Sequence, residues 1–249
     1  MAAGGENTAA HAPRLARRLL VAMAGLSGLQ LLALHGPRTA SAAGELVLCV
    51  FLHTQMNAHA LENLLKDALP GVAVRVFSRA KDFEGGLHQN PDGVLSLLPV
   101  LQANGFKADV QGLRAGSASE RYVLLSASSV TAAAVRSVGA VDFLGRSRMP
   151  AFVAKLLNGN APRVTPVTKL VDLLPLLQFG TVDAVILPER NVPRLKSGTR
   201  LKLQVAELPN PQVGLPALSI LTPAGRRLRD SLLKAGDAVR AEIGVETWR

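Results

Sequence analysis

The stretch LVLCVFLHTQMNAHALENLLKDALPGVAVRV, residues 46–76, decides the fold class. It opens on a continuous apolar run of strand length, 46–52, which predicts a central parallel strand covered on both faces. Asn57 can cap a helix whose apolar residues recur at helical spacing over 61–68. Valines alternate with other residues over 72–76 and predict a second strand. Strand, helix and strand in this order form a right-handed βαβ unit of an α/β protein.

The same alternation of strands and helices continues outward from this unit. The polar, glycine-containing segment 78–91 is expected to be a surface loop, followed by a helix with an apolar stripe from Val94 to Leu101. The remaining strands are expected at 108–113, 122–125, 140–144, 163–167 and 182–187. The remaining helices are expected at 130–136, 149–157 and 170–177, and a last helix begins at Thr222-Pro223 and carries an apolar face to Ile243.

Two short segments repeat. LLPVLQ at 97–102 is matched by LLPLLQ at 173–178, and each is followed by a glycine, an aspartate and an expected strand. Such internal similarity favours two halves that are copies of one structural unit.

The first residues have the layout of an export signal. Arginines within 14–18 precede an apolar run, 19–34, and Ala40 and Ala42 then form an A-x-A cleavage site. We therefore expect residues 1–42 to be a cleaved signal peptide that directs the protein to the periplasm. The adjacent arginines also resemble a twin-arginine signal. An uncleaved membrane anchor is the alternative, but the run is shorter than the roughly 20 residues that a spanning helix needs.

Composition excludes several classes of function. The 249 residues are 48% hydrophobic, enough for a globular core. The net charge of +10 attracts anions, yet only 4% of residues are aromatic, too few for base-stacking platforms, so no nucleic-acid partner is expected. The single cysteine, Cys49, excludes an internal disulfide and is expected to be a buried small hydrophobe. No zinc spacing, nucleotide-binding loop or nucleophile motif is present, so we expect neither a cofactor nor enzymatic activity.

Several segments give the chain its resemblance to a known family. They are ELVLCVF at 45–51, VGAVDFLGRSRMPAFVAKLL at 138–157, the helix-glycine-VDAVIL step that ends at 187, and the terminal GVETWR. With these segments the chain resembles the type II periplasmic solute-binding proteins, particularly the phosphate/phosphonate group that serves ABC transporters.

The resemblance implies an α/β, two-lobed periplasmic-binding-protein type II fold. Each lobe would be a mostly parallel sheet flanked by helices, and crossing hinge strands would join the lobes so that hinge closure traps a solute between them. Residues 44–121 plus 201–249 are expected to form lobe one, and residues 122–200 lobe two.

The turn LGRSRMP, 144–150, is the first candidate for ligand binding. A turn that enters a helix presents unpaired backbone amides and a positive dipole end to an anion. Arg146, Ser147 and Arg148 add charge and a hydroxyl donor, and the resemblance implies that this loop contacts an oxyanion of the solute. The alternative is that the arginines are solvated surface charges.

Two further candidate segments follow expected strands. In open α/β sheets ligands gather outside the carboxyl ends of the strands, which selects Glu189 and Arg190, whereas Asp183 at the start of the same strand is expected to be structural. After the first strand, His53, Gln55 and Asn57 can face the cleft, with the helix cap as the alternative role of Asn57.

The expected function is therefore capture of a small anionic, phosphate- or phosphonate-like ligand, by a monomer, for uptake through the membrane permease of an ABC transporter. Two alternatives stay open. One is a ligand-sensing module without transport. The other is an enzyme on the same fold, related to the pyrimidine-precursor synthases, which would need a reactive histidine or cysteine at the cleft.

Overall fold

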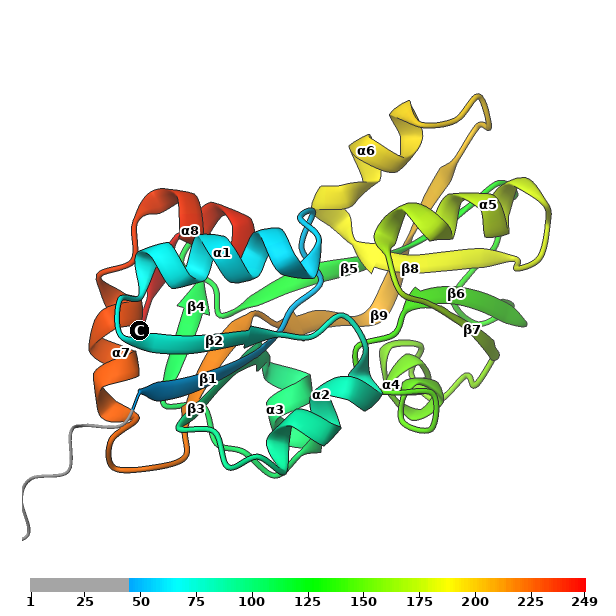
Figure 1. The fold of residues 1–249 in the computed structure, drawn as a ribbon. Helices are drawn as coiled ribbons and strands as arrows, with labels where there is room; N and C mark the ends of the chain where they lie inside the picture. The colour runs from blue at the N-terminus through cyan, green and yellow to red at the C-terminus, as the bar shows by residue number, and fades with distance from the viewer. Residues whose placement is uncertain (1–44) are drawn as a thin grey trace, which may run out of the picture. The chain divides into compact units, whose positions relative to one another are not determined.

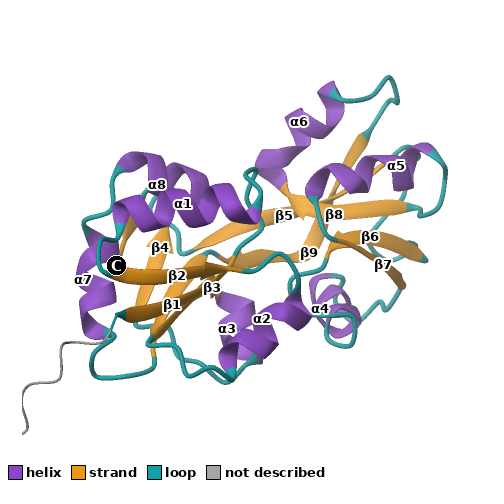
Figure 2. Ribbon diagram, in the orientation of Figure 1, coloured by secondary structure: helices purple, strands orange, loops and turns teal. Residues whose placement is uncertain are grey.

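The computed structural model describes residues 45–249, which form two β-sheets flanked by helices (Figures 1 and 2). The expected signal peptide, 1–42, and its cleavage site lie outside the described residues. Within the described part of the chain, no helix is long and apolar enough to cross a membrane.

The first sheet has six strands in the order β11-β4-β10-β3-β1-β2. Its strands are β1 (Leu46–Phe51), β2 (Val72–Val76), β3 (Gly93–Leu97), β4 (Val110–Leu113), β10 (Pro216–Ile220) and β11 (Thr247–Trp248). β1 runs parallel to β2 and β3, whereas β10 is antiparallel to β3 and β4. Its helices are α1 (Ala58–Ala68), α2 (Ala80–Leu87), α3 (Leu98–Ala103), α7 (Arg226–Leu233) and α8 (Asp237–Ile243).

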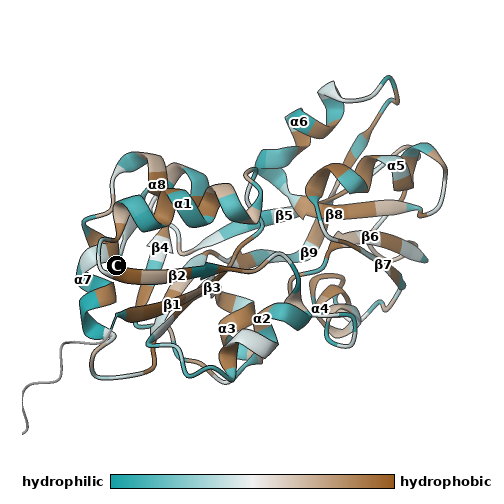
Figure 3. Ribbon diagram, viewed as in Figure 1, coloured by the Kyte–Doolittle hydropathy of each residue, from teal (hydrophilic) through white to brown (hydrophobic). Residues whose placement is uncertain are grey.

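β1 is buried on both faces, as its apolar run predicts. Leu48 and Val50 pack on one face with the buried residues of α1, α7 and α8, while Cys49 and Phe51 pack on the other face with those of α2 and α3. Figure 1 shows α1 and α8 on the side of the sheet opposite α2 and α3, and Figure 3 shows the hydrophobic colouring of β1. The alternating side chains of one strand thus hold two helical layers.

The second sheet has five strands in the order β7-β6-β8-β5-β9. Its strands are β5 (Ser119–Ser126), β6 (Ser137–Val141), β7 (Arg163–Val167), β8 (Ala184–Pro188) and β9 (Gln204–Gly214). β6 is parallel to β7 and β8, and β5 is antiparallel to β8 and β9. Its helical segments are α4 (Met149–Leu156), η1 (Leu170–Asp172), α5 (Leu173–Gln178), η2 (Glu189–Asn191) and α6 (Val192–Ser197).

β5 and β9 connect the two sheets. The chain enters the second sheet along β5 and returns to β10 along β9, and the two strands pair from Ser126↔Gln204 to Ser119↔Gly214. The predicted boundary at residue 201 assigned β9 to the first lobe, whereas β9 pairs with β5 in the second sheet. The predicted and observed assignments differ because the segment that returns to the first sheet, β9, is itself a long strand paired with β5. The division into domains stays a prediction.

Two local predictions in the first half are wrong. Residues 78–91 contain α2, because Phe83 is buried against Phe51 and Phe77 and so anchors a helix within a polar segment. The helix expected from Val94 is strand β3 up to Leu97 and helix α3 only from Leu98. A short apolar run buried on both sides gives no periodicity that separates strand from helix.

The second half also departs from the predictions. Residues 130–136 form turns and not a helix, and the strand expected at 140–144 is β6, three residues earlier. The last helix is two helices, α7 and α8, because Gly236 adopts an extended conformation, φ −66° and ψ 170°, between them.

The repeated LLPxLQ segments do not occupy equivalent places. LLPLLQ forms α5, which connects β7 to β8, the two parallel neighbours of β6. In the first sheet, the helix of the corresponding connection, from β2 to β3, is α2. The residues that do correspond are two aspartates. Asp92 precedes β3 and accepts a hydrogen bond from the Val47 amide at the start of β1, and Asp183 precedes β8 and accepts from the Ser137 amide of β6, each at 2.9 Å. The structural role predicted for Asp183 is confirmed.

We predict that Gly214→Ala destabilises the protein by about 1–3 kcal/mol, the usual cost of overpacking. A Cβ at this position would lie 2.6 Å from Leu98 Cβ, which the backbone of α3 holds in place. Gly85→Ala in α2 is the control, because its Cβ would meet open space and alanine favours a helix interior. Urea unfolding measures both free energies. Equal stabilities of the two variants would show that the crossing strand has room at Gly214.

Candidate functional site

A cavity of about 410 Å³ lies between the two sheets. It is lined by residues 52–58 after β1 and 76–78 at the end of β2, by Ala140, Val141 and Phe143 at the end of β6, and by Ile186, Pro188, Arg190 and Asn191 at the end of β8. The carboxyl ends of parallel strands from both sheets therefore face it, which is the usual place for a ligand in α/β proteins. Its volume falls in the range of small-molecule sites.

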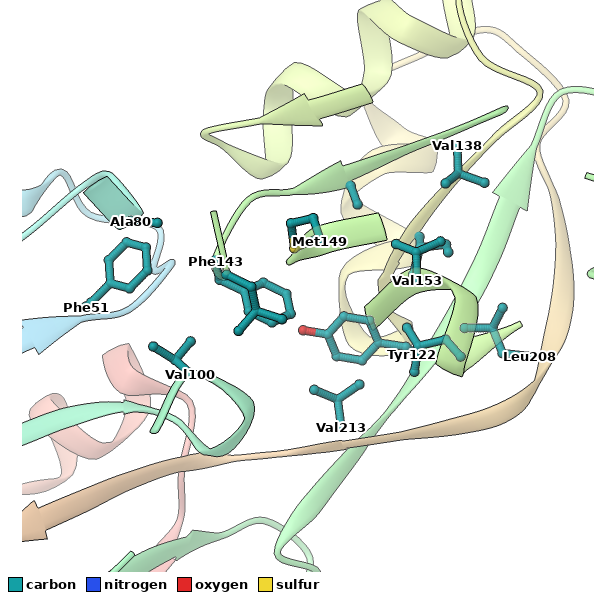
Figure 4. Packing of buried hydrophobic residues seen from close by; sticks show 14 of the residues in the cluster. Phe51, Ala80, Val100, Tyr122, Val138, Phe143, Met149, Val153, Leu208 and Val213 are labelled. Carbon is teal, nitrogen blue, oxygen red and sulfur yellow. The ribbon is translucent and has the colours of Figure 1, made fainter. Parts of the chain in front are cut away.

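One part of the cavity wall is apolar and aromatic. Phe77 comes from the first sheet, and Tyr122, Phe143, Met149 and Phe152 come from the second. The rings of Phe143 and Phe152 pack edge to face with their centroids 4.9 Å apart. In Figure 4, Phe143, Met149 and Tyr122 gather on one side of the cluster, facing Phe51 and Ala80 from the first sheet. Such a wall favours the apolar body of a ligand.

Tyr122 supplies a phenol in this wall. Burial raises the pKa of Tyr122 above its ordinary range, with a contribution in the same direction from Glu120. The hydroxyl points toward Phe143 (Figure 4). Tyr122 is therefore uncharged and keeps its hydroxyl proton for donation.

His53 lines the cavity directly after β1. Its ring lies edge-on to Phe51, with centroids 5.1 Å apart, and to Phe143, with centroids 6.4 Å apart. Both ring nitrogens are buried and have no hydrogen-bond partner within the described residues. This burial lowers the pKa of His53 to about 4, because an imidazolium would be desolvated without compensation. The imidazole is neutral at physiological pH.

Both carboxylates that line the cavity accept hydrogen bonds from the chain itself. Glu120, with only 10% of its side chain exposed, accepts a 2.7 Å hydrogen bond from Arg190 Nε. Glu242 Oε1 accepts hydrogen bonds from the backbone amides of Gln55 and Met56, at 3.1 and 3.0 Å. Glu120 is paired with a cation, whereas Glu242 is held by uncharged amides and keeps its charge.

Two cations of the second lobe have no such partner. Lys169 follows β7 and Arg194 lies in α6, and both are exposed residues of the cavity lining. Within residues 45–249, neither forms an ion pair. The cavity therefore combines an apolar wall with uncompensated positive charge.

Four of the predicted site residues line the cavity: His53, Gln55, Asn57 and Arg190. The side chain of Asn57 also accepts a 2.8 Å hydrogen bond from the Ala60 amide, which confirms its alternative role as the cap of α1. Arg190 is held by Glu120 and lies against Gly244 at the end of α8.

The other four predicted residues, Arg146, Ser147, Arg148 and Glu189, lie outside the cavity lining. Arg148 Nη1 lies 3.6 Å from Glu84 Oε1, and Glu189 Oε2 lies 3.8 Å from Arg121 Nε. The three residues of the turn, 146–148, lie outside the lining because the first residue of α4, Met149, lines the cavity while the turn before it is exposed. A binding role for these four residues stays a prediction.

The polar lining residues that sequence reasoning missed include Glu120, Tyr122, Lys169, Arg194 and Glu242. Lys169 could have been found, because it follows a parallel strand just as Arg190 does. Arg194 and Glu242 lie within helices and carry no local signal of their place at the cavity.

Cys49 is fully buried, as predicted, and burial raises the pKa of its thiol. Its Sγ lies 4.0 Å from the carbonyl oxygen of Gly86. In the described residues, no three histidine, cysteine or acidic side chains come together as ligands for a metal ion.

Comparison with solved structures finds the same architecture. XAC2383 from Xanthomonas citri, in a structure bound to ATP, matches with a TM-score of 0.61 at 13% identity, covering 82% of this chain and 90% of that one. Holo ArgBP from T. maritima matches with a TM-score of 0.50 at 13% identity, covering 80% and 90%. The periplasmic VFT2 domain of BvgS from Bordetella pertussis matches with a TM-score of 0.50 at 15% identity, covering 81% and 93%.

No protein-family model matches the sequence, and no curated protein does either. At these identities the likeness concerns the fold alone. The chain has an α/β, two-lobed periplasmic-binding-protein fold, as predicted from its sequence.

The depressed pKa of His53 predicts a pH-dependent stability. Below the ordinary histidine pKa of about 6.5, the unfolded chain binds a proton at this residue and the folded chain does not, until the pH reaches about 4. The free energy of unfolding should therefore fall by about 3 kcal/mol at most as the pH drops through this window. His53→Phe should remove this component, so the difference between variant and parent grows as the pH falls.

Urea unfolding of both proteins at pH 7, 5.5 and 4 measures this difference. His59→Gln, at an exposed position of α1, is the control and should follow the parent. A constant difference between His53→Phe and parent at all three pH values would contradict the neutral, buried imidazole.

Proposed function

We propose that the chain is an exported binding protein that captures a small organic anion in the cavity between its lobes and presents it to the membrane permease of an ABC transporter. The observation that carries the proposal is the pair of unpaired cations, Lys169 and Arg194, in a cavity whose carboxylates are both engaged. A cationic ligand would meet uncompensated positive charge, whereas an anion would neutralise it.

The wall of the cavity favours an anion with an organic body. Bare phosphate would leave the aromatic and aliphatic surface around Phe77, Phe143 and Phe152 without a partner. A phosphonate, phosphate ester or carboxylate with an apolar group can contact both this wall and the cations. Phosphonates are the ligand class that the sequence resemblance favours.

Proteins of similar fold bind ligands, which supports a ligand-binding function. The structure of XAC2383 holds ATP, and that of ArgBP is described as holo. The paired strands β5 and β9 form the connection about which two such lobes can close on a solute. Export by a signal peptide and delivery to a permease are part of this proposal.

We predict that Arg194→Gln weakens binding of benzylphosphonate by roughly ten- to a hundredfold. A charge-assisted hydrogen bond contributes about 1.5–3 kcal/mol, and about 1.4 kcal/mol is a factor of ten. Lys169→Gln should have an effect of similar size. Lys196→Gln, on the same helix as Arg194 but outside the cavity lining, is the matched control and should bind like the parent.

Calorimetric titration of the parent and the three variants measures these affinities, with inorganic phosphate and benzylamine as comparison ligands. The parent should prefer benzylphosphonate to both. Tighter binding of benzylamine, or no binding of benzylphosphonate at millimolar concentration, would overturn the proposal of an organic anion.

A further inference from the structure

His53 has unused hydrogen-bonding capacity inside the proposed ligand site. Its two ring nitrogens are buried without a partner in the described residues. Arg121 and Trp248 also have a buried nitrogen without a partner, but neither lines the cavity. Burying an unpaired polar group is costly, and a bound ligand can supply the missing partner.

We propose that His53 binds an uncharged polar atom of the ligand, so that the protein selects organic anions whose apolar body carries a hydroxyl, carbonyl or amide group. This inference rests on the proposed function, and it adds the chemistry of the part of the ligand that does not carry its charge.

The surroundings of His53 favour an uncharged ligand group as its hydrogen-bond partner. The ring lies between Phe51 of the first sheet and Phe143 of the second, and burial is the cause of its depressed pKa. An anionic group placed here would lose its hydration beside two aromatic rings and a neutral imidazole. The same group is stabilised at Lys169 and Arg194, in the lining of the same cavity.

A neutral imidazole has one donor and one acceptor nitrogen. It can therefore accept a hydrogen bond from a hydroxyl or donate one to a carbonyl. The backbone amides of Gln55 and Met56, in the loop after His53, already donate to Glu242. They are therefore not available to the anionic end of the ligand, which is expected to bind the cations. The ligand is thus oriented by its two ends, with its apolar part against Phe143 and its neighbours.

Such a contact gives selectivity. A site built to hydrogen-bond a ligand group discriminates against an analogue that lacks it, because the buried protein group then stays unpaired. For a bond between neutral groups, the expected gain is about threefold to tenfold in affinity.

The test compares benzylphosphonate with its 2-, 3- and 4-hydroxy derivatives, which share the anion and the aromatic body. Calorimetric titration is carried out on the parent, His53→Phe and His53→Gln, with His59→Gln as the surface control. We expect at least one hydroxy isomer to bind the parent about threefold to tenfold more tightly than benzylphosphonate. This preference should disappear in His53→Phe, return in part in His53→Gln and persist in His59→Gln.

A second measurement separates ligand contact from structural support. In protein with 15N-labelled histidine, the preferred hydroxy isomer should shift the ring-nitrogen resonances of His53 further than benzylphosphonate does.

Failure of the inference can be told from failure of the proposed function. If all four phosphonates bind the parent equally, or if the preference survives in His53→Phe, the inference is wrong while capture of an organic anion stands. If none of the four binds the parent, the proposed function is wrong and the inference falls with it.

Discussion

The pairing of β5 with β9 is the constraint on which the arrangement of the site depends. These strands carry the chain from one sheet to the other and back, and they are paired with each other along the crossing, with Leu215 donating to the Ala118 carbonyl at 3.0 Å where they leave the first sheet. A paired crossing limits the relative motion of the lobes to bending about the strands. Close packing of Gly214 on Leu98 fixes one end of this connection to α3. The connection therefore restricts how the cavity walls from the two sheets are placed relative to each other.

The electrostatics of the cavity follow from which charges the chain satisfies internally. Arg190 neutralises Glu120, and the amides of Gln55 and Met56 hold Glu242 in place. Lys169 and Arg194 outweigh the charge of Glu242 and leave the lining net positive. In the same lining, burial keeps His53 neutral. One cavity thus offers cationic, apolar and uncharged polar surfaces. Their combination, more than any single residue, restricts the chemistry of a ligand that fits.

Each of the two sheets contains three parallel strands. The two sets of strands resemble each other in small structural contacts more than in sequence. Asp92 and Asp183 each precede the third parallel strand and accept a hydrogen bond from an amide at the start of the first, so they tie equivalent strands together. The more conspicuous LLPxLQ segments occupy different topological places. Leucine-rich helices need only an apolar stripe, which many sequences satisfy, whereas a carboxylate that accepts hydrogen bonds from a neighbouring strand depends on the fold.

By itself, the sequence determined the α/β class, the burial of β1 and Cys49, and the capping role of Asn57, because each depends on local periodicity or on neighbouring residues. The two-lobed fold was implied by the resemblance to periplasmic solute-binding proteins. The sequence located part of the site, since Gln55 and Arg190 follow strands whose carboxyl ends meet at the cavity. Only the tertiary structure decided that the turn at 146–148 lies outside the cavity lining and that Lys169, Arg194 and Glu242 line the cavity. The direction in which a turn or a helix face points is set by packing between distant segments. A single sequence therefore shows which residues can bind, and the packing of the two sheets decides which of them lie where a ligand can reach them.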